Sequence, residues 1–246
     1  MSQPIPGRGA LMPYWHPPVG QAPYPMERAE MMIIECEANP AELARITPSF
    51  CEPGESTRVK IFLANNSQPP TSLRFYEIGV IQEVVYQGET VQTIPYIWVS
   101  DDLAMLGGRE YFGMTKLIMD DSGLQIHANQ VFGRLSRAGV TMAEASMVLD
   151  REAKADELPF KGLASVYERH IPNPNPAKPS LRQLIKLHVT DRTLDGRCWL
   201  GQGYVETRHP LNSGLNRLEL SATDRAWYGV YSWNLPNGEI VDEKEV

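Results

Sequence analysis

The sequence has a shortage of positive charge and of cysteine, and each shortage excludes a class of protein. Its 23 Lys and Arg residues are outnumbered by 30 Asp and Glu residues, which gives a net charge of −7. Nucleic acids and anionic membranes are bound through clustered positive charge, so we expect neither as a partner. The three cysteines, Cys36, Cys51 and Cys198, are odd in number and widely scattered. They favour reduced thiols in a cytoplasmic protein over a disulfide framework.

Long apolar runs and metal-ligand patterns are also missing. No run of about 18 apolar residues occurs, so no transmembrane helix is predicted, and prolines interrupt the amino terminus where a signal peptide would need an apolar core. The five histidines are not paired at metal-ligand spacing and have no cysteine cluster beside them. Gly201-Gln202-Gly203 lacks the third glycine of a dinucleotide-binding motif. We therefore expect a protein without a metal ion or cofactor.

Proline is concentrated at the amino terminus, where residues 1–26 contain seven of them. Such a segment excludes helix and favours an extended backbone. It is either a disordered tail or an arm that wraps a neighbouring subunit, since Tyr14, Trp15 and Tyr24 are costly to leave in water. We expect residues 27–246 to form a single domain.

Short strands dominate the pattern after the proline-rich arm. Asn39 and Pro40 begin a short predicted helix that ends at Ile46, because Asn is a preferred N-cap residue and Pro suits the first helical position. Strands are predicted at residues 59–64, 75–86, 91–99, 124–132, 140–149, 162–170, 185–189, 199–207 and 226–233. Regularly spaced short strands with few helices predict a mainly β fold of the α+β class, built as an antiparallel barrel or a sandwich-like body.

Two charged residues lie in apolar surroundings. Glu77 is in the strand at 75–86, which carries apolar residues on both faces, so it is either half of a structural ion pair or a tuned acid–base group. Lys116 follows a short helix at 103–106, which Ser100-Asp101-Asp102 can cap, and has Met114, Leu117, Ile118 and Met119 as neighbours. An amine among such groups loses its charge more easily and can attack a carbonyl, although a lysine can also pack its stem while its head reaches water.

The segment Gly108-Arg109-Glu110-Tyr111-Phe112-Gly113-Met114-Thr115-Lys116 resembles the signature of the acetoacetate decarboxylase superfamily. Similar segments occur at residues 39–48, 75–79, 170–172 and 184–191, so that the resemblance extends over about residues 24–233. It implies an acetoacetate decarboxylase-like antiparallel β-barrel or cone with a few short helices, and a homo-oligomer. It also implies that Lys116 forms a Schiff base with a small oxo acid.

The same resemblance suggests further site residues. Glu77 matches the family's active-site acid, and Tyr96 matches a cavity-lining position on the strand face shared with Trp98. We expect Lys116, Glu77 and Tyr96 to be catalytic, with the last two moving protons. The predicted substrate-binding residues are Arg28, Phe62, Trp98, Met114 and Leu117.

Departures from the family pattern bear on the reaction. Leu117 replaces a second lysine of true decarboxylases, Ala29 aligns with a family arginine, with Arg28 one position away, and Phe62 aligns with a family glutamate. The imine-forming part is thus retained, while the surroundings of a departing carboxylate are changed. The resemblance therefore favours aldol condensation and dehydration of pyruvate with an aldehyde. The alternatives are decarboxylation of acetoacetate or another 3-oxo acid, and a non-catalytic barrel that binds a small molecule.

Overall fold

Strands make up most of the computed structural model, which describes residues 11–12, 17, 19–20, 22–68, 73–208 and 214–246. Its helical segments are α1 (Pro40–Ile46), α2 (Asp102–Leu106), η1 (Gly107–Phe112), η2 (Ala155–Glu157) and η3 (Leu215–Leu218). Its strands are β1 (Tyr24–Glu37), β2 (Glu52–Pro53), β3 (Arg58–Gln68), β4 (Leu73–Tyr86), β5 (Glu89–Val99), β6 (Lys116–Ile118), β7 (Gln125–His127), β8 (Gln130–Arg137), β9 (Val140–Val148), β10 (Arg151–Glu152), β11 (Ser165–Ile171), β12 (Leu181–Leu187), β13 (Thr193–Gly201), β14 (Gly203–Thr207), β15 (Ser221–Leu235) and β16 (Glu239–Glu245). The predicted mainly β fold is confirmed.

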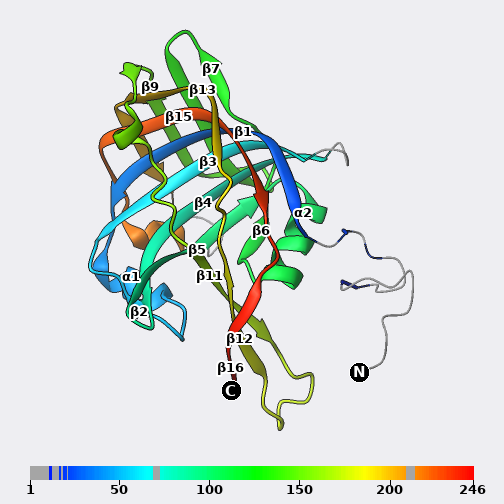
Figure 1. Cartoon of the computed structure of the whole chain (residues 1–246). Helices are drawn as coiled ribbons and strands as arrows, with labels where there is room; N and C mark the ends of the chain where they lie inside the picture. Colours follow the sequence, from blue (N-terminus) through cyan, green and yellow to red (C-terminus); the bar gives the residue numbers. More distant parts are fainter. Residues whose placement is uncertain (1–10, 13–16, 18, 21, 69–72, 209–213) are drawn as a thin grey trace.

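The strands form one large and one small sheet. The large, twelve-stranded sheet has the order β10-β13-β15-β1-β3-β4-β5-β11-β12-β16, with β2 beside β4 and β6 beside β5. The small, four-stranded sheet has the order β14-β9-β8-β7. Figure 1 shows the long strands β15, β1, β3, β4 and β5 curving across the body, with α2 near one end of them. Most pairs are antiparallel as expected, but β5 pairs in parallel with β6 and β11.

The large sheet is buried on both faces. One face, which we call the sandwich face, packs against the small sheet and includes Leu63, Ile78 and Trp98. The opposite face, which we call the site face, buries Phe62 and Ile97 among other apolar side chains. Because successive side chains of a strand point to opposite sides, neighbours in sequence belong to different faces. The predicted burial of both faces of β4 is therefore confirmed.

Both predicted helices are present, and their caps explain where they begin. The side chain of Asn39 accepts hydrogen bonds from the backbone amides that open α1, and Pro40 occupies its first turn. The Asp101 carboxylate accepts from the Ala104 amide at 2.9 Å, which starts α2. The π-helical η1, which the pattern did not predict, continues α2 and ends at Gly113 with φ +75°. A Cβ atom at Gly113 would lie 2.8 Å from the Arg169 backbone, so glycine is required there for space as well as for conformation.

Some strand predictions are wrong in detail. The strand predicted at 124–132 is a hairpin of β7 and β8, which turns at Ala128 with φ 51°. The strand predicted at 199–207 divides at Gln202 into β13 of the large sheet and β14 of the small sheet. The pattern did not predict β1 or β16, because much of β1 is buried on both faces and β16 is mostly exposed, so neither alternates clearly.

The described part of the amino-terminal arm packs against its own chain. Leu11 and Ala22 are buried, and Val19 packs beside Tyr24 and Phe112. The rest of residues 1–26, including Tyr14 and Trp15, lies outside the described residues, and β1 already begins at Tyr24.

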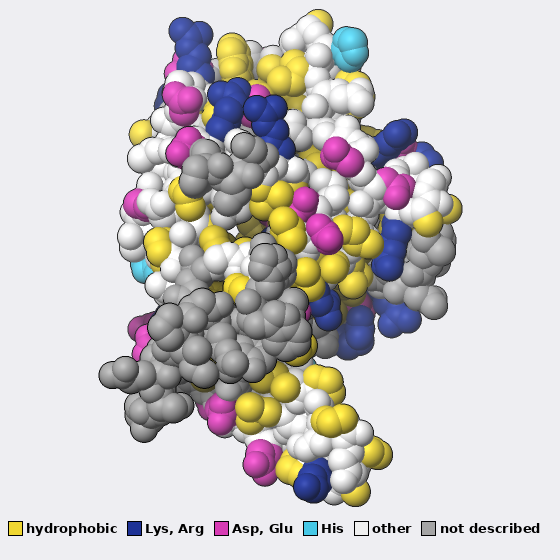
Figure 2. Space-filling view, turned by 90° about the vertical axis from the view of Figure 1, so that its right-hand side faces the viewer, with side chains coloured by type: hydrophobic (Ala, Val, Ile, Leu, Met, Phe, Trp, Pro, Cys, Tyr) yellow, Lys and Arg dark blue, Asp and Glu magenta, His cyan; other side chains and the backbone are white. Residues whose placement is uncertain are grey.

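Charge on the surface is mixed in sign. Among the described side chains on the face shown in Figure 2, Lys and Arg are interspersed with Asp and Glu instead of forming one continuous basic surface. No described helix is long and apolar enough to cross a membrane.

Candidate active site

Lys116 is held on the site face by the residues of its own motif. It begins β6, lies beside Ile97 of β5, and its side chain is only 9% exposed. A Cβ atom at Gly108 would lie 2.5 Å from Cδ of Lys116, so glycine leaves room for the lysine stem. Nη1 of Arg109 donates to the Lys116 carbonyl oxygen at 3.0 Å. Gly108 and Arg109 of the signature therefore act locally, since the glycine leaves space for the lysine side chain and the arginine holds its backbone.

Glu77 reaches the same place from β4. Its Oε1 lies 2.7 Å from Nζ of Lys116, and its side chain is 14% exposed. Nδ2 of Asn66 on β3 donates to Glu77 Oε2 at 3.5 Å. Burying such a pair costs desolvation energy that their attraction often fails to recover, so an ion pair is weak grounds for a purely stabilising role. The arrangement places a proton acceptor directly beside the amine.

A small apolar cavity of about 40 Å³ adjoins Lys116. The centroid of the Phe75 ring lies 5.6 Å from Nζ. Among the residues described, Lys116 is the only cation in the lining. The larger apolar members of the lining are Tyr24, Met26, Phe75, Phe112, Met114 and Leu235. A cavity of this volume can hold a small carbonyl compound, because a single water molecule needs only about 10–15 Å³.

The structure separates Tyr96 and Trp98 from Lys116. The Tyr96 hydroxyl donates to Oε1 of Glu42 at 3.0 Å, and its ring is parallel to that of Trp98 with centroids 6.0 Å apart. Burial and then the hydrogen bond to Glu42 raise the pKa of Tyr96 to about 12. Both rings belong to the sandwich face, because Ile97 between them is the residue that lies beside Lys116. The expectation that they line the lysine's cavity therefore has to be corrected.

The other predicted substrate-binding residues have different positions. Met114 lines the cavity. Phe62 is on the site face but packs beneath Gly79, where a Cβ atom would lie 2.6 Å from its ring. Leu117 lies beside Trp98 in register, away from Lys116, and is 37% exposed. Arg28 is exposed and pairs with Glu30 at 2.6 Å. The prediction that Leu117 and Arg28 bind the substrate in the Lys116 cavity is therefore not met, because neither lines it.

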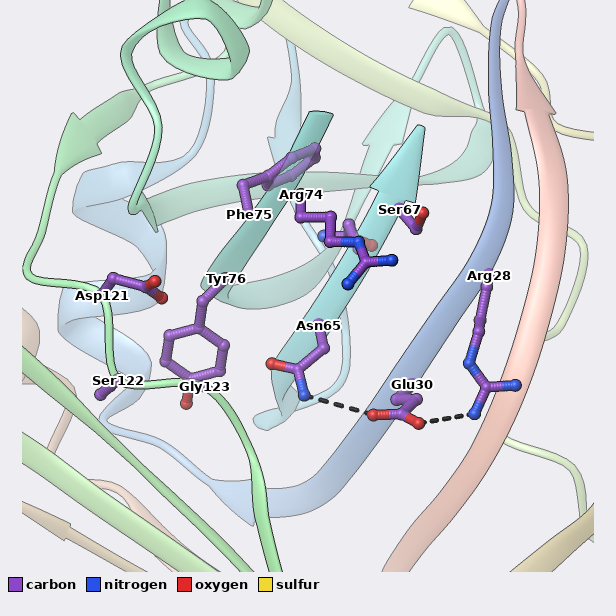
Figure 3. A pocket seen from close by; sticks show the side chains of 11 residues that line it. Arg28, Glu30, Asn65, Ser67, Arg74, Phe75, Tyr76, Asp121, Ser122 and Gly123 are labelled. Atoms are coloured by element: carbon purple, nitrogen blue, oxygen red, sulfur yellow. Dashed lines mark hydrogen bonds and ion pairs between the residues drawn. The ribbon is translucent and has the colours of Figure 1, made fainter. Parts of the chain in front are cut away.

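Arg28 instead lines a larger polar pocket of about 540 Å³ (Figure 3). There the Glu30 carboxylate accepts hydrogen bonds from Arg28 and, at 3.3 Å, from Asn65. Phe75 lines both this pocket and the Lys116 cavity, and Asn66, which contacts Glu77, also lines the pocket. The two spaces therefore share Phe75 as a lining residue.

Asn66 and Phe75 were not predicted as site residues. The position of Phe75 follows from alternation, since it lies two residues before Glu77 on the same strand face. Asn66 has no such signal, because only the register between β3 and β4, in which it lies beside Phe75, brings it to the site. Within the described ranges, no three His, Cys, Asp or Glu side chains come together in a way that could hold a metal ion.

Comparison with known proteins identifies the family of this chain. The family model described as acetoacetate decarboxylase (ADC) matches residues 11–244. The chain is 26% identical over 211 residues to acetoacetate decarboxylase of Chromobacterium violaceum, covering 82% of this chain and 81% of that protein.

Two solved structures have the same fold. The acetoacetate decarboxylase of Legionella pneumophila has a TM-score of 0.81 and 24% identity, covering 91% of this chain and 89% of that one. The enduracididine biosynthesis enzyme MppR, complexed with the condensation product of pyruvate and imidazole 4-carboxaldehyde, has a TM-score of 0.79 and 19% identity, covering 98% of this chain and 97% of that one. Since the family model spans nearly the whole sequence, including the segment that positions the buried lysine, the chain belongs to the acetoacetate decarboxylase family.

Proposed function

We propose that this protein is a Schiff-base lyase that captures pyruvate or a similar small oxo acid on Lys116 and condenses it with an aldehyde, with loss of water. The observation that carries the proposal is the buried amine of Lys116, 2.7 Å from the Glu77 carboxylate beside a small apolar cavity. Glu77 is close enough to take a proton from the ammonium group. The neutral amine that results is the form that attacks a carbonyl.

The reaction then follows from the chemistry of an imine. The amine adds to the ketone carbon, and Glu77 returns the proton to the carbinolamine hydroxyl, which leaves as water and gives a protonated imine that withdraws electrons from the adjacent carbon. Glu77, again a carboxylate, then removes a proton from that carbon and leaves an enamine. The enamine carbon attacks the aldehyde, and the resulting aldol loses water. Hydrolysis of the imine releases an unsaturated oxo acid and restores Lys116.

Two features support aldol condensation and dehydration over decarboxylation. Leu117 is not one of them, because its side chain points away from Lys116 and the residue at that position does not adjoin the amine. Ala29 and Phe62, at the positions where the family resemblance places charges, are both buried in an apolar cluster. MppR, which has the same fold, has been crystallised with a pyruvate–aldehyde condensation product. The relative from Chromobacterium violaceum, named acetoacetate decarboxylase, keeps decarboxylation of a 3-oxo acid as the second candidate.

Trapping with borohydride tests the proposal. The protein is incubated with pyruvate or acetoacetate and reduced, and the modified residue is located by peptide mass. We expect a pyruvate adduct on Lys116 and an unsaturated product when an aldehyde is added. Lys60→Met is the matched control, because Lys60 is another lysine away from the cavity whose pKa is lowered by burial, and this variant should still form the adduct. Rapid release of carbon dioxide from acetoacetate would favour the second candidate, and no adduct with any oxo acid would favour a binding protein.

A further inference from the structure

A second, partly buried cation lies on the site face. The guanidinium of Arg192, just before β13, lies over the Phe160 ring at 3.9 Å from its centroid and near the Trp233 ring at 5.2 Å. Within the described part of the chain it forms no ion pair, and its Nε atom is buried without a hydrogen-bond partner. The adjacent Asp191 does not fill this role, because its carboxylate accepts hydrogen bonds from the backbone and side chain of Asn234.

A partly buried guanidinium without a counter-ion can be completed by a ligand. Burial lowers the pKa of Arg192, although an arginine remains charged at neutral pH. Withdrawing part of a cation from water without a counter-ion costs free energy, which stacking on aromatic rings offsets in part. A stacked arginine is also pre-organised, so its free N–H groups can bind a carboxylate in a bidentate manner.

Arg192 and Lys116 border the same apolar clusters. Phe160 and Trp233 pack against the cluster that contains Ile97, the register neighbour of Lys116. Trp233 also packs against the cluster that contains Phe75, whose ring is 5.6 Å from the Lys116 amine. Burial is the main cause that raises the pKa of the Tyr167 hydroxyl; Glu77, the partner of Lys116, raises it further and Arg192 lowers it. Arg192, which precedes β13, and Lys116 of β6 therefore border the same region of the site face.

We propose that Arg192 binds a carboxylate on the aldehyde reactant, so that the second substrate is an anionic aldehyde. This inference rests on the proposed function. Arg192 does not line the small cavity at Lys116, which has room for little more than the imine-forming substrate. An anion held at Arg192 is then assigned to the partner that approaches the enamine, with its carboxylate several bonds from its carbonyl.

Two aldehydes of equal chain length test the inference. Succinic semialdehyde has a carboxylate at the end of the chain where butanal has a methyl group. With saturating pyruvate we expect kcat/KM to be about tenfold or more higher for succinic semialdehyde, the order expected for a charged hydrogen bond. In Arg192→Met this preference should disappear while the rate with butanal stays within about twofold. Arg225→Met is the matched control, because Arg225 also lies over a tryptophan ring, at 5.1 Å from that of Trp227, and it should keep the preference.

Several outcomes would overturn the inference. A wild-type protein without preference between the two aldehydes would do so, as would an Arg192→Met variant that loses both rates equally. Arg192→Lys keeps the charge and should keep part of the preference. It replaces the methionine variant if that variant fails to give a cooperative thermal transition.

A trapping experiment separates failure of this inference from failure of the proposed function. Arg192→Met should still form the pyruvate adduct on Lys116, since Arg192 acts on the second reactant. If the wild-type protein itself forms no adduct, the proposed function is wrong. Calorimetric binding of succinate, expected for the wild type and lost in the Arg192 variants, then decides whether Arg192 is an anion site, and equal binding by all of them would contradict it.

Discussion

The two faces of the large sheet use polar side chains differently. On the sandwich face the polar group of Tyr96 is satisfied by Glu42, and the surrounding residues form one extended apolar cluster with the small sheet. On the site face the Lys116–Glu77 pair is buried beside a cavity, and Arg192 has no counter-ion within the described chain. Incomplete polar groups alone do not separate the two faces, because Nε1 of Trp98 and the Tyr76 hydroxyl on the sandwich face are also buried without a hydrogen-bond partner among the described residues. What distinguishes the site face is a charged pair beside a cavity, so we expect the sandwich face to stabilise the fold and the site face to carry the chemistry.

The largest expected effect comes from removing the amine. Lys116→Ala should abolish both the borohydride-trapped adduct and turnover, because no other described residue of the cavity lining carries an amine that can form an imine. It also leaves Glu77 buried without its partner, which we expect to cost about 3–5 kcal/mol of unfolding free energy. Intact mass after trapping and a thermal melt measure the two effects. Retained activity would show that Lys116 is not the nucleophile.

A smaller loss of activity is expected when the carboxylate of Glu77 is replaced. Glu77→Gln keeps the shape but cannot accept the proton of the amine, so the rate of imine formation should fall by about 10²-fold. Single-turnover trapping with pyruvate measures this rate directly. A wild-type rate in the variant would make the pair with Lys116 a structural one, the alternative raised by the sequence.

Replacing Gly108, which lies against the Lys116 side chain, should reduce adduct formation to an intermediate extent. In Gly108→Ala the new Cβ atom would lie 2.5 Å from Cδ of Lys116, so the lysine must shift. We expect adduct formation to slow by about tenfold and unfolding to become easier by about 1–3 kcal/mol, the usual cost of overpacking. Gly20→Ala, where a Cβ atom meets nothing within 4 Å, is the control. Equal rates in both variants would show that Gly108 does not position the lysine.

On the sandwich face the corresponding change should affect stability and leave catalysis unchanged. Tyr96→Phe removes the hydrogen bond to Glu42, which we expect to cost about 1 kcal/mol of unfolding free energy. Turnover with pyruvate and an aldehyde should remain within about twofold of wild type. A loss of turnover comparable to that of Glu77→Gln would mean that the two faces are not separated in function.

The smallest effect is expected at Leu117. Because this side chain points away from Lys116 and is 37% exposed, Leu117→Lys should leave the pH profile of adduct formation unchanged. The profile is measured by trapping across a pH series. A displaced optimum would show that the charge at position 117 reaches the amine.

Local features could be predicted from the sequence because their causes are local. The caps at Asn39 and Asp101 act on amides two or three residues away. Gly108 and Arg109 act on Lys116 within eight residues, which is why a short motif is sufficient to point to the lysine. Glu77 stood out because it is a single charge in a strand with apolar residues on both faces.

The tertiary structure decided what depends on register and on contacts between distant segments. Tyr96 and Lys116 are close in sequence, yet the pairing of β5 with β6 places Ile97 beside the lysine, and the two-residue period of a strand then directs Tyr96 to the other face. Asn66 reaches Glu77 only through the register of β3 and β4. Arg192 meets Phe160 and Trp233 only after the segments that carry them converge on the site face. A one-residue change in register would reverse these assignments, and residue identities alone do not set register when both faces of a strand are apolar.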